Sequence, residues 1–69
     1  MIPQDVLEKE FKELKKRFKG FGRHLWDYFI SGFSENPCYR GMNIMVLQEF
    51  GLENLATEEG IEFLLRHAK

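Results

Sequence analysis

The sequence contains little of what usually stabilises very small domains. Its one cysteine, Cys38, excludes an intramolecular disulfide, and two histidines with a lone thiol fall short of the usual structural zinc ligand sets. No apolar run reaches the roughly 18 residues of a membrane span, and no basic segment precedes an apolar one at the start of the chain. We therefore expect no metal and no membrane span, and the unpaired thiol favours a cytoplasmic protein.

Motifs of catalysis and cofactor binding are also missing. The sequence has no glycine-rich phosphate loop, no Ser/His/Asp order and no CxxC pair, and Gly20-Phe21-Gly22 lacks the third glycine of a dinucleotide-binding turn. His24 and Asp27 stand three residues apart, as two metal ligands on one helix would, but two ligands are a weak indication of a metal site. A pocket of about 300 Å³ or more with supporting residues around it needs more room than 69 residues offer. We expect no enzyme and no cofactor.

The composition is that of one folded domain covering residues 1–69. The chain is 43% hydrophobic and 14% aromatic, which is too apolar for a disordered protein. The net charge of −1 hides an asymmetry, because residues 1–24 carry seven cations against four anions and residues 41–69 carry two against five. Such an asymmetry predicts either complementarity within the assembly or a basic surface kept for a partner.

Apolar residues recur at alternating steps of four and three over the first part of the chain. This heptad spacing is typical of a helix that packs along a narrow stripe against another helix. We interpret the stripe, called the seam below, as core or dimer interface. Its members are Leu7, Phe11, Leu14, Phe18, Phe21, Leu25 and Tyr28.

The seam predicts one long amphipathic helix over about residues 4–31. Gly20 and Gly22 each cost about 1 kcal/mol in a helix interior and leave its continuity open. Because the seam continues in phase past both glycines, we keep one helix that is kinked near Gly20. Residues 25–33 are apolar almost all round such a helix, which predicts burial from several sides.

A second helix is expected over residues 37–50. Asn36 before Pro37 fits an N-cap followed by proline at the first helical position, and Gly51 fits a Schellman stop. Gly41 weakens the first turn, so the helix could begin as late as residue 43.

A third helix is expected over residues 57–68, with Thr57 as its N-cap. Acidic residues in its first turn and Arg66, His67 and Lys69 at its end match the helix dipole. The predicted fold is an all-α bundle in which the long helix packs with the two shorter ones. A helix-turn-helix interpretation of the last two is weak, because glutamates begin the helix that would meet DNA.

The main functional signal is a row of cations at steps of four, three and four on the face opposite the seam. Lysines on the outside of an aromatic-rich helix commonly serve only to keep it in solution. The row can also steer an acidic partner or follow a phosphate backbone. Because the cations lie opposite the aromatic seam, one nucleic acid strand has no simple way to use both. The row, called the cationic stripe, comprises Lys12, Lys16, Lys19 and Arg23.

The first turn of the second predicted helix supplies three further candidates. Tyr39 and Arg40 occupy a first helical turn, and both residue types are common in interface hot spots. Cys38 is either a reactive thiol at a helix start or a buried apolar residue, and its spacing with Met42 and Met45 favours burial.

The hypothesis that covers these features is a small non-catalytic protein–protein interaction module such as a regulator, inhibitor, adaptor or small subunit. The aromatic seam is too large for so short a chain to bury, so we expect a homodimer or a required partner, and the stripe favours a partner with an acidic surface. The alternative is a nucleic-acid-binding protein, also dimeric, that tracks phosphates with the same four cations.

Overall fold

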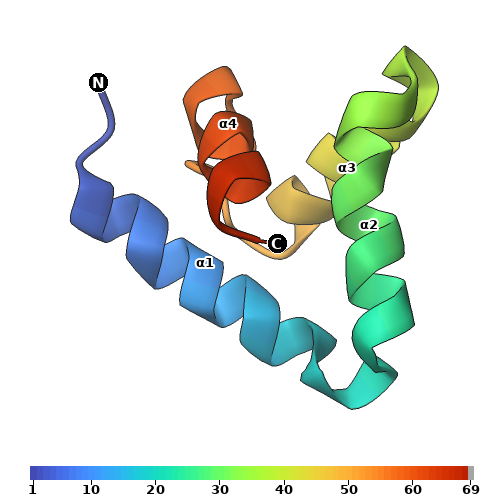
Figure 1. The fold of residues 1–69 in the computed structure, drawn as a ribbon. Coiled ribbons are helices and arrows are strands. Elements are labelled where there is room, and N and C mark those ends of the chain that lie inside the picture. The colour runs from blue at the N-terminus through green and yellow to red at the C-terminus, as the bar shows by residue number, and fades with distance from the viewer. Residues whose placement is uncertain (69) are drawn as a thin grey trace.

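The computed structural model describes residues 1–68 and shows four α-helices and a short 3-10 helix in them (Figure 1). Helix α1 covers Gln4–Phe18 and is followed by the 3-10 helix η1, Lys19–Phe21. Helix α2 covers Arg23–Glu35, α3 covers Pro37–Glu49 and α4 covers Glu58–His67. The all-α fold is confirmed, but with four helices where the sequence predicted three.

The long helix over residues 4–31 is wrong. The chain leaves the helix after Phe18 and turns at Gly22, whose φ of 90° and ψ of 168° lie in a region that only glycine adopts readily. The turn lets Phe18 pack against two aromatic rings of α2, at 5.4 Å from Trp26 and 4.8 Å from Phe29 between centroids. Burial of these rings explains why a corner replaces the continuous helix, since a straight helix carries residues 18 and 29 away from each other.

The start of α3 is as predicted. Asn36 alone separates α2 from α3, and its side-chain oxygen accepts a hydrogen bond of 2.9 Å from the backbone N–H of Tyr39. The helix begins at Pro37, so Gly41 does not delay it. Helix α2 runs on to Glu35 with Gly32 inside it.

Helices α2 and α3 approach closely around one glycine. A Cβ on Gly32 would lie 2.6 Å from the side-chain nitrogen of Asn43, and that nitrogen donates a 2.7 Å hydrogen bond to the carbonyl oxygen of Phe29. The small residue therefore allows an amide of α3 to bond to the backbone of α2.

The predicted helix stop and the last N-cap are also confirmed. The N–H of Leu52 donates to the carbonyl of Leu47 at 2.9 Å, and Gly51 adopts a φ of 78°, as a Schellman motif requires. Thr57 accepts a 3.0 Å bond from the N–H of Gly60 at the start of α4. Lys69, expected to match the dipole of the last helix, lies outside the described residues.

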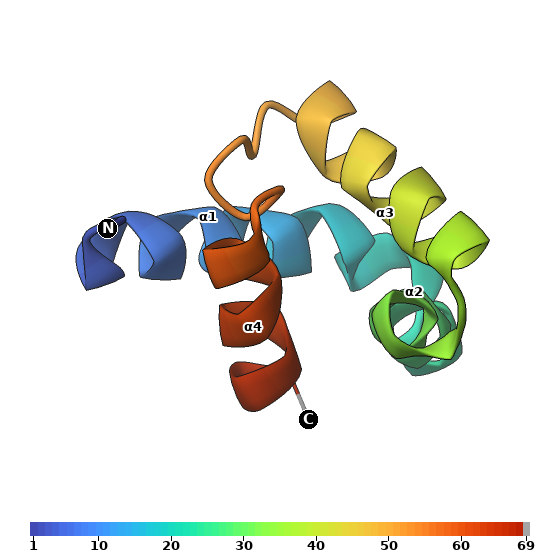
Figure 2. The same cartoon turned by 90° about the horizontal axis from the view of Figure 1, so that it is seen from above.

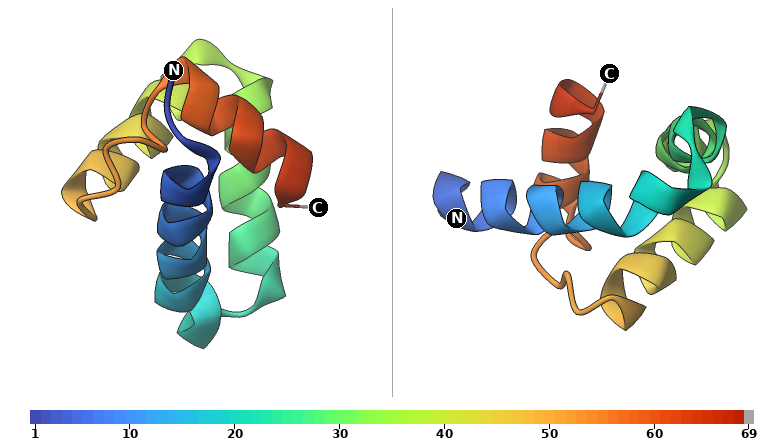
Figure 3. Two further views of the ribbon diagram at one scale, coloured as in Figure 1. Left: turned by 90° about the vertical axis from the view of Figure 1, so that its left-hand side faces the viewer. Right: turned by 90° about the horizontal axis from the view of Figure 1, so that it is seen from below.

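Helices α1 and α2 diverge from the corner like the arms of a V, and α4 lies in its opening (Figure 1). Figures 2 and 3 show that α4 crosses α1 and that α3 and α4 lie on opposite sides of α1. The core is at the meeting of these elements. Its fully enclosed side chains are Leu14, Leu47, Leu55, Ile61 and Leu64.

The connection between α3 and α4 is fixed by two close contacts. Glu10 of α1 accepts hydrogen bonds from the side chain of Asn54 at 2.6 Å and from the N–H of Leu55 at 2.9 Å. Gly60 is buried so tightly that a Cβ there would overlap the carbonyl oxygen of Asn54 and the Cα of Leu55. The connection is therefore built into the core.

Candidate functional site

The seam residues divide into two groups at the corner. Leu7, Leu14 and Phe18 are buried, and Phe11 is half-buried against rings of α2 and α4. The last three seam residues are instead exposed: Phe21 by 68%, Leu25 by 41% and Tyr28 by 66%. The first part of the seam is therefore core, and the second part is apolar surface.

The prediction that residues 25–33 are buried from several sides is wrong. Helix α2 buries Phe29, Ile30 and Phe33 on one side. The opposite side faces outward because α2 has neighbours on only part of its circumference. Leu25 and Tyr28 thus stay exposed to solvent although they are apolar residues of α2.

An apolar groove of about 270 Å³ lies between α2 and α3. Leu25, Tyr28 and Gly32 line it from α2, and the rings of Phe18 and Phe29 also contact it. The α3 side is formed by Tyr39, Met42, Asn43 and Val46, and Glu35 lies at the end of α2. We call this hollow the α2–α3 groove.

Exposed apolar side chains continue beside this groove. Met42 is 62% exposed, and Met45 is 63% exposed one turn further along α3. Phe21 packs against Phe18 with its ring centroid at 6.4 Å. Except for Met1, every large apolar side chain that is exposed in residues 1–68 belongs to η1, α2 or α3. We call this set the apolar face: Phe21, Leu25, Tyr28, Tyr39, Met42 and Met45.

Part of this face could be predicted from the sequence. Two residues of the seam, Leu25 and Tyr28, line the α2 side of the groove, and Gly32 and Glu35 follow them at the same spacing. Met42 and Met45 were placed on a helical apolar side but not recognised as surface. Nothing in their spacing distinguishes a covered side from an open one.

The four residues of the cationic stripe are all exposed, but they lie on three elements. Lys12 and Lys16 are on α1, Lys19 is in η1 and Arg23 begins α2. The stripe is predicted for one continuous helix, but the turn at Gly22 places Arg23 on a different helix from Lys12 and Lys16.

The corner gathers cations with aromatic rings in a pocket of about 330 Å³ that the sequence did not reveal. Lys19 and Arg23 line it together with Lys15 and His67, around Phe11, Phe18 and Trp26. The expectation that so short a chain lacks room for a pocket of this size is wrong. The expectation that cations and aromatic residues lie on opposite faces is also wrong here, because the corner brings lysines, an arginine and aromatic rings together. We call this hollow the corner pocket.

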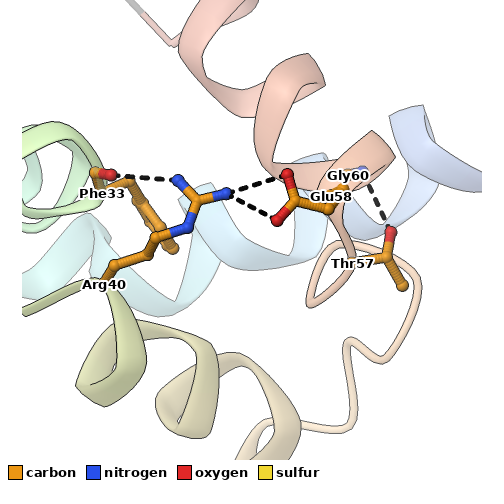
Figure 4. Close-up of polar contacts among 5 residues, drawn as sticks. All are labelled: Phe33, Arg40, Thr57, Glu58 and Gly60. Atoms are coloured by element: carbon orange, nitrogen blue, oxygen red, sulfur yellow. Dashed lines mark hydrogen bonds and ion pairs between the residues drawn. The ribbon is translucent and has the colours of Figure 1, made fainter. Parts of the chain in front are cut away.

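Tyr39 and Arg40 have different surroundings. Tyr39 is 44% exposed and lines the α2–α3 groove. Arg40 points the other way and donates hydrogen bonds of 3.1 Å to the carbonyl of Phe33 and of 3.1 and 3.2 Å to Glu58 (Figure 4). Arg40 thus joins the end of α2 to the start of α4, and only Tyr39 faces the groove.

Cys38 is exposed, so the expectation of burial is wrong. It stands in the first turn of α3, where the helix has few neighbours.

The candidate metal residue Asp27 pairs with Arg23 at 3.6 Å across one helical turn. Within residues 1–68 no group of three or more histidine, cysteine, aspartate and glutamate side chains lies close enough to hold a metal ion.

None of the helices in the described part of the chain combines the length and the apolar character needed to cross a membrane. No protein-family model, curated protein or solved structure gives a significant match to this chain.

Proposed function

We propose that this protein is a non-catalytic protein–protein interaction module that pairs with a second copy of itself through the α2–α3 groove and the apolar face around it. The observation that carries the proposal is the concentration of exposed aromatic and methionine side chains beside one apolar groove. Large exposed apolar patches normally mark an interface, and methionine-rich surfaces adapt readily to an apposed apolar surface.

The charges around the groove favour a second copy as the occupant. Among the described residues that line it there is no lysine or arginine, and Glu35 is the only acid. A strongly charged partner finds little counter-charge there, whereas a second copy brings the same largely apolar surface. Lys12 and Lys16 lie on another element, so two copies can meet without apposing these lysines.

The shape of the face suits a two-fold pair. Leu25 and Tyr28 protrude from α2 beside the groove, so each copy offers both a ridge and a hollow, as an interface between identical surfaces requires. A standard interface buries about 800 Å² per partner. That is about a sixth of the 4976 Å² surface of the described structure.

The dimer would leave the cationic stripe free for an acidic partner. Lys12, Lys16, Lys19 and Arg23 are exposed and do not line the groove. Pairing two copies doubles the cations available to one partner and raises its association rate through electrostatic steering.

The test is sedimentation equilibrium of the parent and of two charge-introducing variants, Tyr28→Lys and Met42→Lys. A lysine at either position must lose water when the copies meet, so we expect each variant to weaken the dimer at least tenfold, equivalent to about 1.4 kcal/mol. Gln48→Lys is the matched control, because residue 48 is exposed on α3 but does not line the groove. The proposed face would be contradicted if the control weakened the dimer as much as the groove variants do, or if both groove variants kept the dimer affinity of the parent.

A further inference from the structure

We propose that the corner pocket binds a small organic anion that carries a flat aromatic ring, with the ring against the aromatic floor and the anionic group at the cationic rim. The corner pocket opens between α1, the start of α2 and the end of α4, and Phe18 is the residue that it shares with the α2–α3 groove.

The floor of the pocket is made of rings that contact one another. Trp26 lies with its centroid 6.2 Å from Phe11 and 5.4 Å from Phe18. The indole N–H of Trp26 donates a 3.3 Å hydrogen bond to the carbonyl of Ala68, which fixes the ring against the end of α4. A floor held in this way is available for contact with a flat apolar ligand without reorganisation.

The rim of the pocket is basic. Lys15, Lys19 and Arg23 line it with His67, and no acidic side chain in residues 1–68 does so. Lys15 holds its ammonium 5.3 Å from the centre of the Phe11 ring, which directs this charge over the floor. Within residues 1–68 the one ion pair of Arg23 is an exposed 3.6 Å contact with Asp27, an interaction of little strength that an incoming anion can replace.

A ligand with both a charged group and an aromatic ring matches the pocket best. Exposed lysines bind a simple anion weakly, because each surface ion pair contributes little. Contact between an aromatic side chain and a flat ring adds affinity that does not depend on charge. The volume of about 330 Å³ is at the small end of ligand pockets, which favours one ring with one charged group over a larger molecule.

The single tryptophan makes the pocket directly observable. The ¹⁵N-labelled chain gives one indole N–H signal, from Trp26, which lines the pocket. Adenosine monophosphate is the probe, with adenosine as the ring without the charge and inorganic phosphate as the charge without the ring. We expect a saturable shift of the indole signal by the monophosphate, with binding at least tenfold tighter than for either fragment.

Two double variants locate the binding. Lys15→Glu/Lys19→Glu reverses two charges on the rim, and Lys12→Glu/Lys16→Glu makes the same change in net charge on α1 residues that do not line the pocket. We expect the rim variant to lose binding tenfold or more and the control to stay within about twofold of the parent, apart from general screening.

Three results would overturn the proposal. The first is the absence of a saturable shift in the millimolar range. The second is equal binding of the monophosphate and either fragment, which removes one half of the ligand chemistry. The third is an equal loss in the two double variants, which reduces the effect to net charge.

Discussion

Gly22→Ala tests the corner on which both candidate surfaces depend. A Cβ at position 22 meets no atom within 4 Å, so the substitution causes no clash with neighbouring residues. Its whole cost comes from the backbone, because φ of 90° with ψ of 168° costs a non-glycine residue about 1–3 kcal/mol. In a continuous helix the same change would instead stabilise the protein by about 1 kcal/mol. The turn at residue 22 and a continuous helix thus predict opposite signs for the change in stability.

The matched control is Gly41→Ala. Gly41 lies within α3 and is exposed, and a Cβ at this position also meets no atom within 4 Å. Alanine there gains about 0.5–1 kcal/mol in helix propensity. Gly22→Ala and Gly41→Ala should therefore differ by about 1.5–4 kcal/mol in stability, with the parent between them.

Thermal and urea unfolding followed by circular dichroism measure this difference. For a chain of this size, 1 kcal/mol corresponds to about 4–8 °C in Tm. All three proteins must be compared at one chain concentration, because self-association makes stability depend on concentration. A Gly22→Ala protein as stable as the parent, or more stable, would refute the turn at residue 22.

Two further substitutions test the connection between α3 and α4. Gly60→Ala should lower the free energy of unfolding by about 1–3 kcal/mol in urea, because the new Cβ meets the backbone of Asn54 and Leu55, which cannot rotate aside. Unchanged stability would mean that the connection does not lie against α4. Glu10→Ala should lower the free energy of unfolding by about 2 kcal/mol, because it removes two charge-assisted hydrogen bonds to the connection. The control Glu13→Ala removes an exposed ion pair with Arg17 and should cost about 0.5 kcal/mol or less. Equal effects would show that Glu10 makes no more than a surface contact.

The helix ends could be predicted because their causes are local. Asn36 and Thr57 accept hydrogen bonds from N–H groups three residues later, and Gly51 needs its positive φ for contacts within six residues. Such patterns are complete within a short window of sequence. They define α3 and α4 to within about one residue.

The corner could not be predicted in the same way. The apolar spacing of Phe18, Phe21 and Leu25 is the same for one straight helix and for two helices that meet at a turn. What favours the turn is the packing of Phe18 against Trp26 and Phe29, a contact across the corner that a helical pattern does not encode.

The position of both candidate surfaces depends on how the helices pack. The seam includes Leu25 and Tyr28, but whether these apolar residues lie in the core or on the surface depends on the elements packed around α2. The corner pocket likewise requires Lys15 of α1 and His67 of α4 to meet, and these residues are remote in the sequence.

The most direct test of the self-association uses the single cysteine. Cys38 is exposed at the start of α3, the helix that forms one side of the groove, so a nitroxide can be attached there without altering any other residue. Mixing the labelled chain with ¹⁵N-labelled chains that carry no nitroxide reports only contacts between copies. The proposed dimer predicts broadening of the signals of Tyr28 and Met42, with those of Lys12 and Lys16 much less affected. The absence of broadening between copies, or broadening centred on α1, would contradict it.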